Sequence, residues 1–244
     1  WRAPSHIANH LSSVVIITAV LAVLAVGSRV QAFGVQRDWY PEWVGRKVAH
    51  FGFGVLVLLS WTLYPEGPAV RWIATVPPTA VALYFTAIGV GWVSDPGTVR
   101  AGSRAGSPAG LLRGPVFYSG VFVLLTITFW RTSPVGMAAL GFMILGDGMA
   151  EVFGKTIRSP SLPWNAEKSV AGSVAAFVFG WIGGVAGLSL LISGGWIAGP
   201  LSAYAFPMVW VAVAGTAVES LPFQEIDNAT ATLGCVAVGM LVFA

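Results

Sequence analysis

Residues 169–218 read SVAGSVAAFVFGWIGGVAGLSLLISGGWIAGPLSAYAFPMVWVAVAGTAV and contain no Asp, Glu, Lys or Arg. A helix that crosses the hydrocarbon core of a bilayer needs about 20 mostly apolar residues. The run is therefore long enough for two such helices, and Ser193, Gly194 and Gly195 near its middle are typical of the turn between them. This stretch by itself predicts an integral membrane protein.

Six other charge-free windows each have about the length of one membrane span. They cover residues 3–28, 48–65, 72–94, 114–130, 132–146 and 228–244 of the 244-residue chain. We therefore expect an all-α, multi-pass transmembrane helical bundle of about eight spans, with the fifth extending through Asp147 and Glu151 and the last cut off at Ala244. Neither an internal repeat nor a long linker divides the chain, so we expect one domain over residues 1–244.

The composition excludes several other classes of protein. Only 9% of the residues are charged, against about 25% in ordinary soluble domains. The single cysteine, Cys235, excludes a disulfide framework and a cysteine-ligated metal site. A formal net charge of +3, scattered along the chain, argues against a nucleic-acid partner.

The basic residues predict how the chain is oriented, because cytoplasmic loops carry an excess of Lys and Arg. Only Arg2, Arg71 and Arg131 fall on one side of the expected spans. We take the other side as cytoplasmic, which places the N-terminus outside. Its connection over residues 94–114 is rich in Gly, Ser and Pro and predicts a mobile loop. The basic residues on this side are Arg29, Arg37, Arg46, Lys47, Arg100, Arg104, Arg113, Lys155, Arg158 and Lys168.

Two carboxylates interrupt the fifth apolar run, in the segment GDGMAEVFG at residues 146–154. Ionisable groups at membrane depth are costly unless they face a cavity or a partner, so they are candidate functional residues. Asp147 and Glu151 are four residues apart and share a helix face. Such a pair suits Mg²⁺, which binds one or two carboxylates together with substrate phosphates. The alternative is that the fifth span ends at Leu145 and both carboxylates lie in a hydrated loop.

A lysine precedes the long charge-free run, in the segment KSVAGS at residues 168–173. A helix beginning near Ser169 would present free N–H groups and the positive end of its dipole to an anion, and Lys168 adds a charge beside them. This pattern predicts a phosphate site. The alternative is a topology-setting lysine followed by a serine N-cap. No glycine run precedes Lys168, so the segment is not a P-loop.

A cationic segment, RKVAH at residues 46–50, stands at the entry to the second span. Arg46 and His50 share a helix face, and Lys47 lies between them in the sequence. The two cations suit phosphate oxygens, and His50 is a candidate base because an unperturbed histidine titrates near neutral pH. The alternative is a topology signal, since a basic pair beside a span commonly has no other role.

An acidic connection follows the seventh span on the same predicted side. Glu219 ends that span, and Asp227 and Asn228 open the eighth. The alternative is that Asp227 or Asn228 is only an N-cap and Pro222 only a helix stop. Phosphoryl transfer requires a metal on the phosphates, cations on the developing charge and a carboxylate near the attacking hydroxyl. The four segments place all of these parts on one side of the membrane.

In these segments the sequence resembles the CTP-dependent lipid-alcohol kinases, which include dolichol kinase, the CTP-dependent diacylglycerol kinase and phytol kinase. Within that group it most resembles the phytol kinase branch. The resemblance covers the second helix entry and most of residues 141–244. It is carried by RKVAH at 46–50, GDGMAEVFG at 146–154, LPWN at 162–165 with KSVAGS at 168–173, and VESLP at 218–222 with IDN at 226–228.

The resemblance implies transfer of the terminal phosphate of CTP, or of a similar nucleotide, to a prenyl alcohol such as phytol, geranylgeraniol or farnesol. It implies Mg²⁺ as cofactor, on Asp147 and Glu151, and a prenyl tail that lies between helices and opens to lipid. The candidate catalytic residues are then Asp147, Asp227, Glu219 and His50. The residues expected to bind the nucleotide and its phosphates are Arg46, Lys47, Gly146, Gly148, Gly154, Lys168, Ser169, Gly172 and Asn228.

Other functions stay open at this point. A dolichol or diacylglycerol kinase would use the same parts on another acceptor. A CDP-lipid synthase would transfer a nucleotidyl group from CTP with a similar acidic metal layout, although such enzymes usually carry a denser cluster of aspartates. A transporter or channel would explain Asp147 as an ion site, but it would not explain why the polar groups gather on one side.

Overall fold

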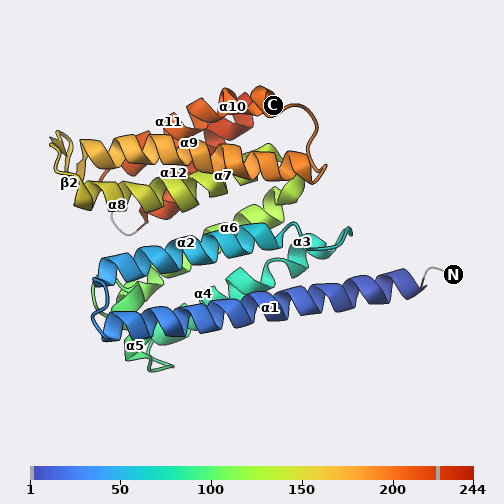
Figure 1. Ribbon diagram of the computed structural model, residues 1–244, viewed down its shortest axis with the longest axis horizontal. Coiled ribbons are helices and arrows are strands. Elements are labelled where there is room, and N and C mark those ends of the chain that lie inside the picture. The colour runs from blue at the N-terminus through green and yellow to red at the C-terminus, as the bar shows by residue number, and fades with distance from the viewer. Residues whose placement is uncertain (1–2, 224–225) are drawn as a thin grey trace. The chain divides into compact units, whose positions relative to one another are not determined.

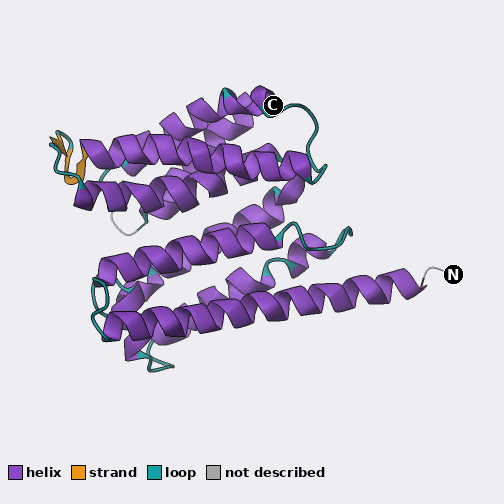
Figure 2. Cartoon of the chain, in the orientation of Figure 1, coloured by secondary structure: helices purple, strands orange, loops and turns teal. Residues whose placement is uncertain are grey.

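The chain folds almost entirely into helices in the computed structural model, which describes residues 3–223 and 226–244 (Figure 2). The one sheet among these residues is the antiparallel hairpin of β1 (Ser161–Leu162) and β2 (Asn165–Ser169). The predicted all-α class is confirmed. The helices are α1 (Ala3–Gln36), α2 (Glu42–Ser60), α3 (Val70–Ile73), α4 (Val76–Gly89), α5 (Pro96–Gly102), η1 (Pro108–Leu112), α6 (Gly114–Thr128), η2 (Trp130–Thr132), α7 (Pro134–Gly141), η3 (Phe142–Asp147), α8 (Gly148–Thr156), α9 (Val170–Ser193), α10 (Ser202–Ala205), α11 (Pro207–Glu219) and α12 (Asp227–Val242).

Five helical segments are long and apolar enough to cross a membrane. A helix also lies in each of the remaining predicted windows. Of these, α11 has 13 residues and α12 has 16, while α2 begins with the charged residues Glu42, Arg46 and Lys47. The count of eight spans therefore stays a prediction. The five qualifying segments are Leu11–Gln36, Val70–Gly89, Pro108–Thr128, Pro134–Thr156 and Val170–Ser193.

The helices group into two compact units, residues 1–127 and 128–244. The first unit contains α1 to α5 and nearly all of α6. In the second, α9 packs beside α8 and α11, and α11 packs beside α12 (Figure 1). This division into units does not test whether residues 1–244 form a single domain, so that expectation stays a prediction.

In the first unit, helices α5 and η1 occupy the connection that was expected to be a loop. Asp95 caps α5 by accepting a hydrogen bond from the Thr98 N–H at 3.0 Å. The Gln31 side chain on α1 donates to the Ala101 oxygen at 3.4 Å, and Leu111, which belongs to η1, is fully buried. The prediction of a mobile loop over residues 94–114 is wrong, because a cap and buried apolar contacts hold most of it in helices.

Glycines allow α7 and α9 of the second unit to approach very closely. A Cβ added to Gly141 would lie 2.4 Å from the Gly183 oxygen, and one added to Gly183 would lie 2.3 Å from the Gly141 oxygen. Because backbone atoms cannot move aside as a flexible side chain can, neither position has room for a side chain. Small residues at helix contacts are typical of helices that pack in lipid.

The π-helix η3 joins α7 to α8 and ends at Asp147. π-Helices are rare and occur mostly as single turns inside α-helices, frequently at functional sites. The ring of Phe142 fills the space left by two glycines, because a Cβ on Gly180 or Gly215 would lie only 2.3 Å or 2.6 Å from it. These contacts with α9 and α11 hold η3 in place and so determine where Asp147 lies.

Candidate functional site

Asp147 lies inside a continuous helical segment. The segment Pro134–Thr156 passes through it, and Asp147 is only 4% exposed. The alternative of a hydrated loop after Leu145 is therefore wrong. One turn later, Glu151 accepts a hydrogen bond from the Lys155 ammonium at 2.6 Å. The two predicted metal ligands thus differ, since Asp147 is buried and Glu151 is paired with a neighbouring lysine.

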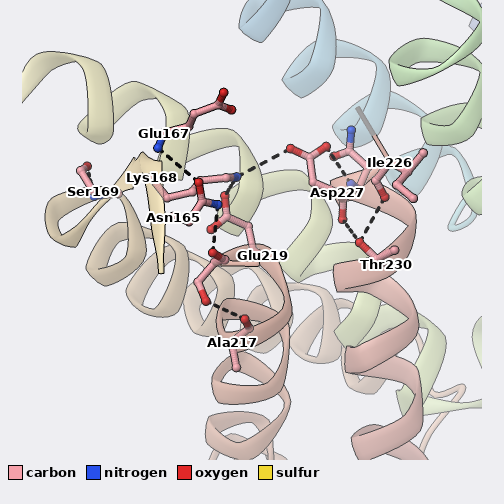
Figure 3. Close-up of polar contacts among 12 residues, drawn as sticks. Asn165, Glu167, Lys168, Ser169, Ala217, Glu219, Ile226, Asp227 and Thr230 are labelled. Carbon is pink, nitrogen blue, oxygen red and sulfur yellow. Dashed lines mark hydrogen bonds and ion pairs between the residues drawn. The ribbon is translucent and has the colours of Figure 1, made fainter. Parts of the chain in front are cut away.

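Three further predicted residues meet at the polar end of the second unit (Figure 3). The Lys168 ammonium donates a hydrogen bond to Oε1 of Glu219 and lies 3.7 Å from Oδ2 of Asp227. These side chains come from β2, the last residue of α11 and the first residue of α12. The Glu219 and Asp227 side chains are 3% and 5% exposed, so the ion pairs are largely shielded from water.

Asp147 interacts electrostatically with the same lysine. Burial by itself lowers the pKa of Lys168, but the negative charges of Glu219, Asp227 and Asp147 raise it above the ordinary value of 10.5. The ammonium is therefore charged at neutral pH although its surroundings are poorly hydrated. We refer to Asp147, Lys168, Glu219 and Asp227 as the Lys168 cluster.

The β1–β2 hairpin fixes Lys168 over the end of α11. Asn165 donates from its side-chain nitrogen to the Ser220 oxygen at 3.1 Å and accepts from the Glu167 N–H at 3.2 Å. The indole N–H of Trp164 donates to the Ser220 hydroxyl at 3.2 Å. Sequence reasoning assigned no role to Trp164, Asn165 or Ser220. The available indication was the LPWN motif, which lies just before Lys168.

The first three N–H groups of α9 already have protein acceptors. The N–H groups of residues 170–172 donate, in order, to Pro160 O at 3.0 Å, Ser159 Oγ at 3.0 Å and Ser169 Oγ at 3.2 Å. The prediction that this helix end offers free N–H groups to phosphate is wrong for these three. Ser169 is the N-cap, as the alternative stated.

The glycines expected to bind phosphate lie at helix contacts. A Cβ on Gly146 would lie 2.9 Å from a backbone oxygen of α9, and one on Gly172 would lie 2.9 Å from a backbone oxygen of α8 and 3.5 Å from Gly154. Gly148 is buried in the first turn of α8. Close packing explains why residues 146, 154 and 172 are small, and a role in phosphate binding stays a prediction for all four.

Helix α12 begins at Asp227, so the residue at its N-cap position is Ile226, and no side chain caps the helix. The alternative that Asp227 or Asn228 is the N-cap is therefore wrong. Oδ1 of Asp227 accepts from the Asn228 N–H at 3.1 Å. Asn228 is 7% exposed, and its Oδ1 has no hydrogen-bond partner among the described residues. A buried amide oxygen without a donor costs free energy, so it is a candidate acceptor for a hydrogen-bond donor of a ligand.

The predicted residues Arg46, Lys47 and His50 lie on α2 in the first unit. Lys47 is only 4% exposed. The His50 ring lies 4.3 Å from the ring of Tyr118, whose hydroxyl donates to the His50 oxygen at 3.0 Å. A lysine that only sets topology normally extends to water. The burial of Lys47 therefore argues against the topology-only alternative, and phosphate binding stays a prediction.

A metal ion would find hard oxygen donors in the Lys168 cluster. Within residues 3–223 and 226–244, no three His, Cys, Asp or Glu side chains gather closely enough to cage a metal by themselves. Mg²⁺ does not require such a cage when substrate phosphates complete its coordination, because one or two carboxylates are then enough. The buried carboxylate of Asp147 fits this requirement in its donor chemistry.

Comparison with known proteins finds relatives among plant kinases. Probable phytol kinase 1, chloroplastic, of Glycine max is 32% identical over 230 residues, which cover 92% of this chain and 76% of that protein. Phytol kinase 1, chloroplastic, of Arabidopsis thaliana is 30% identical over 210 residues, covering 85% and 69%. The farnesol kinase, chloroplastic, of the same plant is also 30% identical, covering 85% and 68%. No family model matches the chain, and no solved structure matches it.

Proposed function

Because the chain belongs to the phytol and farnesol kinase family, we propose that it transfers the terminal phosphate of CTP, or of a similar nucleotide, to a prenyl alcohol. The acceptor is an alcohol such as phytol, geranylgeraniol or farnesol, and the product is its monophosphate. The observation that supports this most strongly is the Lys168 cluster, in which Glu219 and Asp227 lie beside a charged lysine and Asp147 interacts with that lysine electrostatically.

Lys168 binds the phosphate oxygens of the nucleotide. Its ammonium is held charged by its acidic neighbours, and it lies on a hairpin that is tied to α11 through Asn165 and Ser220. A charged donor at a fixed place can stabilise the negative charge that develops on the transferred phosphoryl group. Arg46 and Lys47 are proposed as further cations for the triphosphate.

Asp147 would hold Mg²⁺, and Glu151 one turn later would be the second ligand. When bound, the ion would neutralise phosphate charge and orient the triphosphate. Asp147 is suited to this role because it is buried at a fixed position by the packing of η3. Gly146, Gly148, Gly154 and Gly172 would keep the surrounding backbone close to the phosphates.

Asp227 receives the proton of the alcohol. Its Oδ2 lies toward Lys168, and its Oδ1 accepts from the Asn228 N–H. As the alcohol oxygen forms its bond to the γ-phosphorus, the bond from that phosphorus to the β,γ-bridging oxygen breaks, the proton passes to the carboxylate and the nucleoside diphosphate leaves. Glu219 and His50 are the other candidate bases. Glu219 is the weaker candidate, because its carboxylate already binds Lys168.

The reaction takes place at the cytoplasmic surface of a membrane that the chain crosses several times. This setting is supported by the five long apolar helices and by the excess of Lys and Arg on the predicted cytoplasmic side. The prenyl tail stays among lipid-facing helices, so that only its hydroxyl reaches the Lys168 cluster.

The test is an incubation of the purified protein in detergent with γ-labelled CTP, Mg²⁺ and either phytol or geranylgeraniol. Label that appears in the lipid, together with release of CDP, supports the kinase. Release of pyrophosphate with cytidine in the lipid would instead indicate a nucleotidyltransferase. In parallel incubations with dolichol or diacylglycerol, label that enters either lipid in preference to phytol and geranylgeraniol would contradict the proposed acceptor. Repeating the assay with other nucleoside triphosphates identifies the donor.

A further inference from the structure

The tip of the β1–β2 hairpin carries a tryptophan that no step of the proposed reaction uses. Trp164 is 60% exposed. The edge of its indole is fixed, because the ring N–H donates to the Ser220 hydroxyl at 3.2 Å. A ring that is anchored by one edge and widely exposed presents a rigid aromatic surface to the surroundings.

Trp164 is linked to the Lys168 cluster in two ways, through the chain and through a hydrogen bond. Trp164 precedes Lys168 by four residues, so their Cα atoms are at most ~14 Å apart even in a fully extended chain. Its hydrogen-bond partner, Ser220, directly follows Glu219, which binds the Lys168 ammonium. Asn165 adds a second bond to Ser220 at 3.1 Å. The aromatic surface therefore stands within one nucleotide's length of the proposed phosphate site.

We propose that Trp164 is the platform on which the base of the donor nucleotide stacks. This inference rests on the proposed function, because it requires that Lys168 binds the triphosphate. Stacking on an aromatic side chain commonly contributes a factor of ~5 to ~150 in affinity per base. It accepts every base, because each base has a π-face. Trp164 therefore strengthens nucleotide binding without choosing between cytosine and another base.

A membrane-interface anchor is the competing explanation for an exposed tryptophan. The chain has 11 tryptophans, and such residues are enriched where a protein crosses the lipid headgroups. Trp210 on α11 provides the matched control, since it is 53% exposed and in the same unit. The two explanations differ in what they predict for ligands with and without a base.

The experiment measures KM for CTP and the inhibition constant of inorganic tripolyphosphate, which has the phosphates but no base. In Trp164→Ala we expect KM for CTP to rise by ~5- to ~150-fold, while the constant for tripolyphosphate stays unchanged. Trp164→Phe keeps an aromatic face but cannot donate to Ser220, so its rise in KM should be well below that of Trp164→Ala and close to that of Ser220→Ala. Ser220→Ala loses the anchoring bond and should give a smaller rise. Trp210→Ala should change neither constant.

An equal rise for CTP and tripolyphosphate in Trp164→Ala would overturn the inference, because it would mean that the hairpin and Lys168 had moved. No change in either constant would overturn it in favour of a membrane anchor. Unchanged tripolyphosphate binding shows at the same time that the variant is folded. If neither ligand acts on the parent protein, the proposed function itself fails, and that result is distinct from the other two.

Discussion

Lys168 is the residue on which the polar end of the second unit depends. Its ammonium is the one cationic member of the Lys168 cluster, and it faces Glu219, Asp227 and Asp147. A largely buried carboxylate is tolerated only where charge or hydrogen bonds compensate it. Removing the lysine charge should therefore affect stability as well as catalysis.

We expect Lys168→Met to lower the free energy of unfolding by about 2 kcal/mol, a buried-pair cost reduced for the partial exposure of the lysine. The folded-state pKa of Lys168 is raised, so its contribution is fully present below the unfolded value, near 10.5, and is lost as the pH rises through the folded value. Thermal unfolding in detergent on both sides of pH 10.5 should show the gap between parent and variant narrowing at alkaline pH.

Lys155→Met is the control for that measurement. Lys155 pairs with Glu151 one turn away and its side chain is 44% exposed, so its removal should cost less than about 0.5 kcal/mol. If the two variants lose the same stability, the Lys168 cluster does not contribute as described.

Asp147→Asn keeps the size of the side chain and removes its charge. If Asp147 holds Mg²⁺, turnover should fall by about 10³-fold, or ~4 kcal/mol of transition-state stabilisation. The elution profile and unfolding temperature should stay near those of the parent. Glu151→Gln should lose less, because Glu151 is engaged with Lys155. Near-normal turnover by Asp147→Asn would exclude the metal-site assignment.

The four residues of the Lys168 cluster are among those that the sequence singles out by residue type and position, although Asp147 and Asp227 are far apart in the chain, and their roles stay predictions. An ionisable residue inside or beside an apolar run is conspicuous in a sequence. The hydrogen-bond partners of the α9 N–H groups were not predictable in this way. They depend on how Ser159, Pro160 and the β1–β2 hairpin fold back over the start of α9, and the composition of these residues does not indicate that arrangement.

At the scale of helices and strands, close backbone contacts determine how the second unit packs. Gly141 on α7 and Gly183 on α9 touch through their backbones. Charge-free windows predicted that helices would lie here, because their length and polarity are readable. The π-helix η3 was not predicted, because an apolar sequence does not indicate whether its backbone hydrogen bonds join residues four or five apart.

Gly183→Ala tests this packing. The added methyl would meet the Gly141 oxygen at 2.3 Å, so α7 and α9 must separate, and we expect a loss of about 1–3 kcal/mol in stability. Gly120→Ala on α6 is the matched control, because a Cβ added there would have no neighbouring atom from another part of the described chain within 4 Å. Alanine should there stabilise the helix by up to about 1 kcal/mol. Unfolding temperatures in detergent that move in the same direction would contradict this account.

At the scale of the whole molecule, the family resemblance stated from the motifs is confirmed by relatives that align over most of the chain. The two compact units were not predicted, because an unbroken series of apolar windows has no composition change to mark a boundary. The orientation in the membrane rests on the distribution of basic residues, and it can be tested directly.

Cys235 is the only cysteine and is fully buried, which makes single-cysteine labelling simple. In a Cys235→Ala background, we expect Ser193→Cys to react with an impermeant maleimide added outside intact cells. Glu167→Cys, on β2 just before the other end of α9, should react only after permeabilisation. Both positions are exposed. Labelling of Glu167→Cys from outside would reverse the predicted orientation.

The π-helix that ends at Asp147 also affects how many residues the chain needs to reach this aspartate. A turn with i→i+5 bonds holds about one residue more than an α-turn, so the helix resembles a regular one with a single residue inserted before the carboxylate. Removing one residue from η3, such as Ile144, would restore α-helical bonding and leave Asp147 in nearly its present direction, because the wider turn completes about the same rotation with one residue more. A relative could thus lack one residue in this run, keep the GDG motif and still aim its aspartate at Lys168. When related chains are aligned, a one-residue gap before the aspartate is therefore compatible with the same site, whereas a substitution of the aspartate removes its carboxylate.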